Sequence, residues 1–236
     1  MTLPYEALMP LAPWERPEEL QQAIDGLRYQ TLPPARLVVS ADGPPPAALR
    51  RVLEQAGLPL TLIDGPGGEG VGPVLARGLQ ACREELVARI DADDRSLPDR
   101  CRIQVEEMGG RPELAALSGP ILEFIDDPAS PCGVRWVPAS GASIQQWSRW
   151  RNPLNHPAVM LRRSAVLAVG GYRRSPGFED YDLWLRLLKA RGAASLANGS
   201  EPLVQVRVGR DHLARRRGLA YARSEISFLC RCGQEG

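Results

Sequence analysis

The first half of the sequence alternates between short apolar runs and longer segments of helical character, and this order limits the possible folds. The apolar runs have the length of strands and lie at residues 6–9, 36–39, 58–63 and 86–90. The segments of helical character lie at residues 17–27, 46–56, 72–82 and 98–108. Strands that alternate with helices form a parallel sheet with right-handed crossovers. The sequence therefore predicts an α/β fold with a mostly parallel central sheet flanked by helices.

The second half of the sequence is less regular. Further strands are predicted at residues 114–117, 121–124, 158–161 and 203–208, and an amphipathic helix at 180–190. Residues 126–152 are rich in Pro, Ser and Trp and show no clear period, so we expect a long loop there. Loops of that length in compact chains are usually functional or mobile. We expect one continuous domain made of two halves, residues 1–118 and 119–236.

Bulk properties exclude several classes of protein. The chain has 236 residues, 44% of them hydrophobic and 24% charged, which is typical of a globular protein. A formal net charge of +1 argues against a dedicated nucleic-acid binder. No apolar run reaches the length of about 20 residues that a membrane span needs, and the first residues lack a signal-peptide pattern. Five scattered cysteines indicate a reducing compartment, so we expect a cytoplasmic location.

Three carboxylates follow the apolar run at residues 86–90. They belong to Asp91, Asp93 and Asp94. In open α/β sheets, ligands bind at the edge where the carboxyl ends of the strands meet. Carboxylates this close together need a counter-charge, and hard oxygen ligands suit Mg²⁺ or Mn²⁺, ions that commonly hold the phosphates of a nucleotide. We therefore expect chemistry on a phosphorylated donor.

Two other interpretations of this run stay open. The acids could form a polar turn that caps the helix near Pro98, although one Asp suffices for a cap. Some phosphatases also carry Asp-x-Asp after a strand. Those enzymes have Thr or Val two residues beyond the second Asp, where this chain has Arg95.

Asp42 follows the predicted strand at 36–39 and belongs to the same edge of the sheet. An acid there can accept hydrogen bonds from a base or a ribose, although Asp-Gly-Pro is also a turn sequence. The glycine-rich stretch at residues 65–72 lacks the lysine of a phosphate-binding loop. We interpret it as a flexible loop.

Two further charged groups have a functional and a structural interpretation. Asp180 lies in Glu-Asp-Tyr-Asp at the start of the predicted helix, where acids favour the first turn, but a carboxylate there can also act as a general base. Arg215 and Arg216 lie in a basic run at residues 210–217. This run is either a solvated face or a lid that neutralises a leaving diphosphate.

The order of these motifs resembles family 2 inverting glycosyltransferases of the A-type (GT-A) fold, which is Rossmann-like. Within that family it is similar to the bacterial group that builds capsular and extracellular polysaccharides, including amylovoran-type enzymes. The matching phrases span nearly the whole chain. They are QTLPP at 30–34, DGP at 42–44, ARIDADD at 88–94, NHPAVM at 155–160, GGY at 170–172 and EDYDLW at 179–184.

The resemblance implies a role for each candidate residue. Asp42 contacts the nucleoside of the donor, and Asp91 and Asp93 form an Asp-x-Asp motif that binds Mn²⁺ or Mg²⁺ on the diphosphate. Asp180 deprotonates the acceptor hydroxyl, and Arg215 and Arg216 bind the diphosphate or close over the product. Residues 1–118 would bind a nucleotide-diphosphate sugar, and residues 119–236 a glycan or lipid-linked glycan acceptor. This implies at most peripheral contact with the inner face of the plasma membrane.

The chain departs from the family pattern around the nucleoside. Ala12, Ala41 and Ala76 stand where the family usually has Tyr, an acid and Asn. These changes motivate a second hypothesis, a catalytically weak or inactive nucleotide-binding module on the same fold. A nucleotidyltransferase is a third hypothesis, but such enzymes usually grip phosphates with a basic glycine-rich loop after the first strand. Here that strand is followed by Ala-Pro-Trp.

Overall fold

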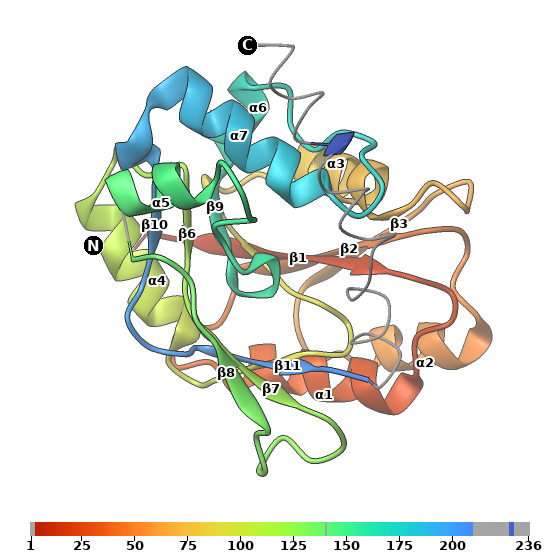
Figure 1. Cartoon of the computed structure of the whole chain (residues 1–236). Helices are drawn as coiled ribbons and strands as arrows, with labels where there is room; N and C mark the ends of the chain where they lie inside the picture. The colour runs from red at the N-terminus through yellow and green to blue at the C-terminus, as the bar shows by residue number, and fades with distance from the viewer. Residues whose placement is uncertain (1–2, 140, 210–226, 229–236) are drawn as a thin grey trace.

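A computed structural model describes residues 3–139, 141–209 and 227–228 of the chain. Its main sheet has seven strands in the order β10-β6-β9-β4-β1-β2-β3 (Figure 1). These strands are β1 (Tyr5–Leu11), β2 (Arg36–Ala41), β3 (Leu60–Asp64), β4 (Leu86–Arg89), β6 (Ala116–Ser118), β9 (Met160–Arg162) and β10 (Leu196–Asn198). Only β9 runs antiparallel to its neighbours, β4 and β6. The mostly parallel central sheet that the alternation predicts is therefore confirmed.

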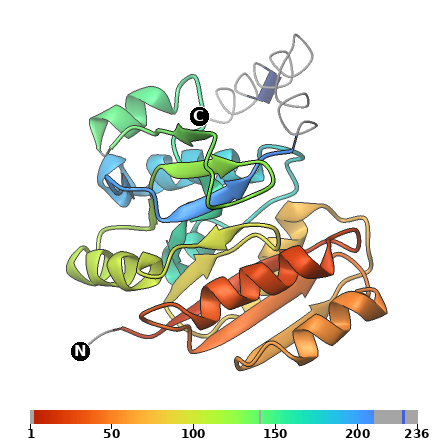
Figure 2. The ribbon, with the colours of Figure 1, turned by 90° about the horizontal axis from the view of Figure 1, so that it is seen from below.

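Helices cover both faces of this sheet (Figures 1 and 2). Side chains of β1 alternate between the two faces: Met9 packs with the helices below the sheet in Figure 1, and Leu8 with the helices above. The lower helices are α1 (Pro17–Arg28), α2 (Ala47–Glu54) and α4 (Arg100–Gly110). The upper helices are α3 (Val71–Ala81), α6 (Arg163–Ala168) and α7 (Glu179–Arg191). No helix in the described part of the chain is long and apolar enough to cross a membrane.

A second sheet of four strands, in the order β5-β11-β7-β8, lies beside the carboxyl end of β4. It consists of β5 (Arg95–Ser96), β7 (Ile121–Phe124), β8 (Gly133–Arg135) and β11 (Val204–Arg207). The expectation of an irregular loop at residues 126–152 is wrong in part, because that stretch contains β8 and helix α5 (Ala142–Trp147). Two 3₁₀ turns, at His156–Ala158 and Ala193–Ser195, complete the described elements.

The two halves expected from the sequence share one sheet. Strand β9 of the second half lies between β4 and β6 of the first. Arg100, at the start of α4, fixes this junction from inside the core with its fully buried guanidinium group. It donates hydrogen bonds to the backbone oxygens of Arg89 (2.8 Å) and Val159 (3.3 Å), and to the hydroxyl of Ser96 (3.0 Å). The end of β4, the start of β9 and the second sheet are thus bound to one side chain.

We expect Arg100→Met to lower the free energy of unfolding by about 2–4 kcal/mol, because buried acceptors at Arg89 and Ser96 lose a charged donor. Urea denaturation followed by circular dichroism measures this change. Arg102→Met is the matched control, since the neighbouring Arg102 lies at the surface of the same helix and should matter little. Equal stability of the two variants would contradict the role given to Arg100.

Candidate functional site

The three acids predicted from the sequence meet at the carboxyl end of β4. Carboxylate oxygens of Asp91, Asp93 and Asp94 all lie within 4.8 Å of one another. Strand β4 lies inside the main sheet, between β1 and β9, so the chain that leaves it enters the cleft at the sheet edge. The structure therefore brings Asp91, Asp93 and Asp94 together at this edge, and their binding roles stay predictions.

Each acid in this cluster has different surroundings. Asp91 forms an ion pair with Arg89, the last residue of β4. Asp94 is buried, and its Oδ1 accepts a hydrogen bond from the backbone N–H of Arg207 in β11 at 2.9 Å. Its Oδ2 is also buried and has no hydrogen-bond partner among the described residues. A buried carboxylate oxygen without a donor is costly, and a cation relieves that cost.

The carboxyl groups also repel one another. Burial and the nearby Asp91 raise the pKa of Asp93 to about 6. Burial, Asp91 and Asp93 hold the pKa of Asp94 well above its usual range. Glu15, in the loop between β1 and α1, has a pKa raised to about 7 by burial and by Asp93 and Asp91. This all-oxygen donor set fits a hard divalent cation, which would relieve the repulsion between the charges.

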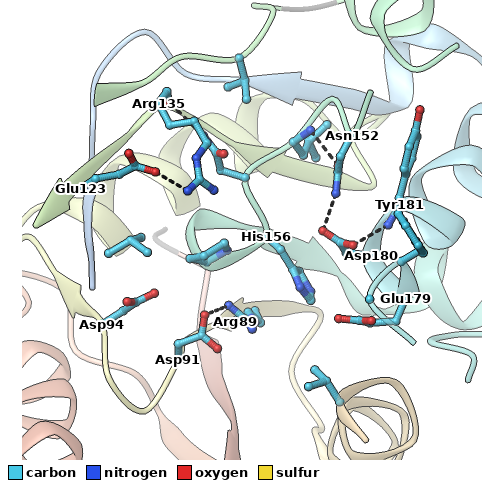
Figure 3. A pocket seen from close by; sticks show the side chains of 18 of the residues that line it. Arg89, Asp91, Asp94, Glu123, Arg135, Asn152, His156, Glu179, Asp180 and Tyr181 are labelled. Atoms are coloured by element: carbon cyan, nitrogen blue, oxygen red, sulfur yellow. Dashed lines mark hydrogen bonds and ion pairs between the residues drawn. The ribbon is translucent and has the colours of Figure 1, made fainter. Parts of the chain in front are cut away.

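A cleft of about 610 Å³ opens beside this cluster. Asp91 and Asp94 line it on one side, and Glu179 and Asp180, in the first turn of α7, line it on the other (Figure 3). Asp93 also lines the cleft. His156 lies between these groups and forms a second cluster with Glu179 and Asp180, with ligand atoms within 4.8 Å of one another. Asp180 therefore opens onto the same cleft as the acids after β4.

The carboxylate of Asp180 is held in place by hydrogen bonds from both sides. Its Oδ2 accepts a hydrogen bond from Nδ2 of Asn152 at 2.6 Å, and its Oδ1 accepts one from the backbone N–H of Tyr181 at 2.8 Å (Figure 3). His156 is oriented in turn by a hydrogen bond of 2.8 Å between its Nε2 and the Tyr172 hydroxyl. Such bonds fix the orientation of a carboxylate.

Other residues expected at the site are placed differently. The carboxylate of Asp42 accepts hydrogen bonds from the backbone N–H groups of Glu69 and Gly70, at 2.9 and 3.3 Å, and Asp42 does not line the cleft. A role toward a nucleoside stays a prediction. Arg215 and Arg216 lie outside the described residues.

Sequence reasoning missed Glu15 and Asn152. Both are single polar residues in loops, and nothing in their local sequence distinguishes them from ordinary surface residues. Asn152 lies 28 residues before Asp180, so only the folded chain brings the two together. Asp94 was visible in the run of acids, but the sequence did not indicate its buried oxygen.

Comparisons with known proteins agree on one family. Residues 14–169 match the profile of "Glycosyl transferase family 2". The chain is 34% identical over 226 residues to the "Amylovoran biosynthesis glycosyltransferase AmsE" of Erwinia amylovora, with 95% of this chain and 84% of that protein covered. It is 30% identical over 230 residues to a "UDP-Gal:alpha-D-GlcNAc-diphosphoundecaprenol beta-1,3-galactosyltransferase" of Escherichia coli, covering 94% of this chain and 80% of the relative.

Two solved structures share the fold at low sequence identity. One is S. aureus TarS 1-349 in complex with UDP-GlcNAc, with a TM-score of 0.69 and 14% identity. The match covers 87% of this chain, which spans 59% of that structure. The mannosyltransferase PcManGT from Pyrobaculum calidifontis, in complex with GDP-Man and Mn²⁺, has a TM-score of 0.66 and 15% identity, with 97% and 70% covered. The fold is the GT-A type that the motifs predicted.

We expect MnCl₂ to raise the melting temperature of the chain near pH 7.5 and much less near pH 5, because carboxylates must lose their protons to bind a cation. The pKa of Asp93, raised to about 6, places this loss of metal binding between the two pH values. Thermal unfolding with MnCl₂ or EDTA measures it. Asp93→Asn should abolish the shift, and Glu54→Gln, at an exposed position, is the matched control.

The Asp93→Asn variant also tests whether repulsion between the acids destabilises the fold when no metal is bound. With a folded-state pKa above its unfolded value, Asp93 costs stability once it ionises, so stability falls as the pH rises from about 4 to about 6. In EDTA near neutral pH, Asp93→Asn should therefore unfold at a higher temperature than the wild type. A wild type that responds to neither MnCl₂ nor pH would contradict this account of the acid cluster.

Proposed function

The chain belongs to glycosyltransferase family 2, and we propose that it transfers a sugar, with inversion, from a nucleotide-diphosphate sugar to a hydroxyl of a glycan acceptor. One observation carries the proposal: the acid cluster after β4 and the carboxylate of Asp180 line one cleft from different elements (Figure 3). Transfer of a glycosyl group needs charge stabilisation at the leaving group and proton removal at the nucleophile. The two groups of acids suit these two tasks.

The acid cluster serves the donor side. Asp91 and Asp93 would hold Mn²⁺ or Mg²⁺, with the buried Oδ2 of Asp94 as a further ligand. When bound, the cation supplies positive charge against the charge that develops on the leaving diphosphate. Arg89 lines the cleft beside Asp91 and adds a guanidinium group on the same side. Support for the cation comes from the oxygen donors and from the Mn²⁺ in the PcManGT complex.

Asp180 serves the acceptor side as general base. Its oxygens are oriented by Asn152 and Tyr181, and its place at the start of α7 puts it on the positive end of a helix dipole. It takes the proton from an acceptor hydroxyl, and that oxygen attacks the anomeric carbon from the face opposite the diphosphate. The bond to the diphosphate breaks as the new glycosidic bond forms, so the configuration inverts.

The names of the relatives support the acceptor and the process. One relative is named for amylovoran biosynthesis and another for transfer to a diphosphoundecaprenol-linked sugar. We therefore propose a lipid-linked glycan acceptor, in surface polysaccharide assembly at the inner face of the plasma membrane. Asp42 is proposed for the nucleoside, and Arg215 and Arg216 for the diphosphate. A panel of nucleotide sugars incubated with MnCl₂, with release of nucleoside diphosphate as the readout, tests the reaction class.

We expect Asp180→Asn to lower kcat by about 10²- to 10⁴-fold, because the acceptor hydroxyl loses its proton acceptor. The dissociation constant of the nucleoside diphosphate should not change, since the acid cluster is intact. Asp182→Asn is the matched control: Asp182 lies in the same turn of α7 but pairs with Arg186. Unchanged kcat in Asp180→Asn would remove the general base from the mechanism.

Asn152→Ala should lower kcat by about 10- to 100-fold, because a misplaced catalytic group costs that much in rate. Its hydrogen bond orients the base and does not touch the donor, so KM for the donor should stay at the wild-type value. Gln146→Ala, an exposed change on α5, controls for nonspecific effects. A rise in the KM for the donor without loss of kcat would contradict the positioning role.

A further inference from the structure

One long segment of the chain carries arginines that no acid within it offsets. Residues 128–178 contain seven arginines and no Asp or Glu, although the whole chain has a formal net charge of only +1. The remaining residues together therefore carry −6. The same segment holds three of the five tryptophans, Trp136, Trp147 and Trp150. The absence of acids and the number of tryptophans distinguish this segment, because its share of arginine is close to that of the whole chain.

The arginines of this segment divide into two groups. Arg162 and Arg163 donate to backbone carbonyls inside the fold, and Arg135 pairs with Glu123. Arg149, Arg151, Arg173 and Arg174 are exposed and form no ion pair with any described residue. Their charge is therefore available to a partner.

Trp147 and Trp150 lie close to Arg149 and Arg151 in the sequence, and Trp136 lines the same cleft as Trp147 and Arg151. Trp136, Trp147 and Trp150 have 65%, 43% and 74% of their surface exposed. We call the group of Trp136, Trp147, Arg149, Trp150 and Arg151 the Trp-Arg edge. Large apolar rings exposed together mark an interaction surface.

The Trp-Arg edge is fixed to the body of the protein. Helix α5 buries Ile144, and the buried Ser148 after it accepts a hydrogen bond of 2.8 Å on its carbonyl from the Tyr181 hydroxyl of α7. The backbone then turns, with the N–H groups of Trp150 and Arg151 bonded to the carbonyl of Trp147. The edge is therefore a preformed surface, tied to the helix that carries Asp180.

The edge also forms part of the rim of the cleft. Trp136, Trp147 and Arg151 line the cleft together with Asp180. Any partner that covers the edge therefore lies beside the proposed general base. This continuity relates the surface to the acceptor side of the site.

We propose that the Trp-Arg edge docks on the surface of an anionic lipid bilayer. Tryptophan rings favour the interface between lipid and water, and arginines near the surface are attracted to anionic head groups. The link to an acceptor rests on the proposed function. With a lipid-linked glycan as acceptor, docking would hold the head group of the acceptor at the cleft while its lipid tail stays in the bilayer. The docking itself rests on the exposed rings and free arginines.

A second copy of this chain is a poorer occupant of the edge. In a two-fold contact each copy presents the same patch to the other. The arginines of the two edges would then lie together with no acid of the edge between them, and like charges disfavour such a contact. An anionic lipid surface supplies the opposite charge directly.

The test is co-sedimentation of the full chain with phosphatidylcholine vesicles that contain or lack phosphatidylglycerol, without donor or acceptor. The wild type should bind the anionic vesicles and lose binding as salt is added. The double variant Arg149→Gln, Trp150→Ser should bind at least about fivefold more weakly, the effect of one arginine near an anionic surface. Its melting temperature should match that of the wild type, because both side chains are exposed.

The matched control removes the same two residue types elsewhere. Trp14 is 75% exposed, and Arg16 follows in the same loop between β1 and α1. Figures 1 and 2 place that loop and α5 on opposite sides of the molecule. The double variant Trp14→Ser, Arg16→Gln should therefore bind vesicles as the wild type does.

Three outcomes would overturn the proposal: no wild-type binding to anionic vesicles at low salt, equal binding by the edge variant, or self-association in sedimentation velocity that the edge variant loses. The last result would identify a second copy as the occupant. Transfer to a water-soluble acceptor, assayed separately, distinguishes the two proposals. Transfer without vesicle binding rejects the docking alone, and vesicle binding without transfer rejects the proposed function alone.

Discussion

The buried guanidinium group of Arg100 is the interaction on which the site depends. It ties the last carbonyl of β4 to the chain that enters β9 and to the second sheet through Ser96. The acids begin two residues after that carbonyl, at Asp91. Their backbone therefore leaves the sheet from a fixed point, although the acids themselves repel one another. A backbone anchored in this way lets the protein keep like charges close together although they repel one another.

The second sheet and helix α7 add the groups that complete the cleft at the carboxyl end of β4. Strand β11 supplies the N–H group that holds one oxygen of Asp94 and leaves the other buried without a donor. Helix α7 delivers Asp180 from the other side, with Asn152 to orient it. The chemistry proposed for the cleft thus draws on elements from both halves of the chain. Neither half contains the complete arrangement.

Much of this arrangement could be predicted from the sequence, because it depends on local pattern. The apolar run before Asp91 and the helical spacing after Asp180 locate both acids on the correct elements. Elements of two or three residues, such as β5 and β8, are too short to show a period and were missed. Partners distant in sequence were also missed. The N–H groups that donate to Asp42 belong to Glu69 and Gly70, and no local sequence pattern predicts these hydrogen bonds.

The position of β9 has a consequence for how the chain is made. Strand β6 joins the main sheet only through β9 and β10, and β4 has β1 as its other partner. During synthesis from the N-terminus, residues 116–118 therefore have no strand to pair with until residues 160–162 have emerged from the ribosome. Until then β4 is an open edge strand with its apolar residues in place, a template for incorrect pairing. In that interval the nascent chain is open to incorrect pairing at β4, and a chaperone that shields this strand would act there.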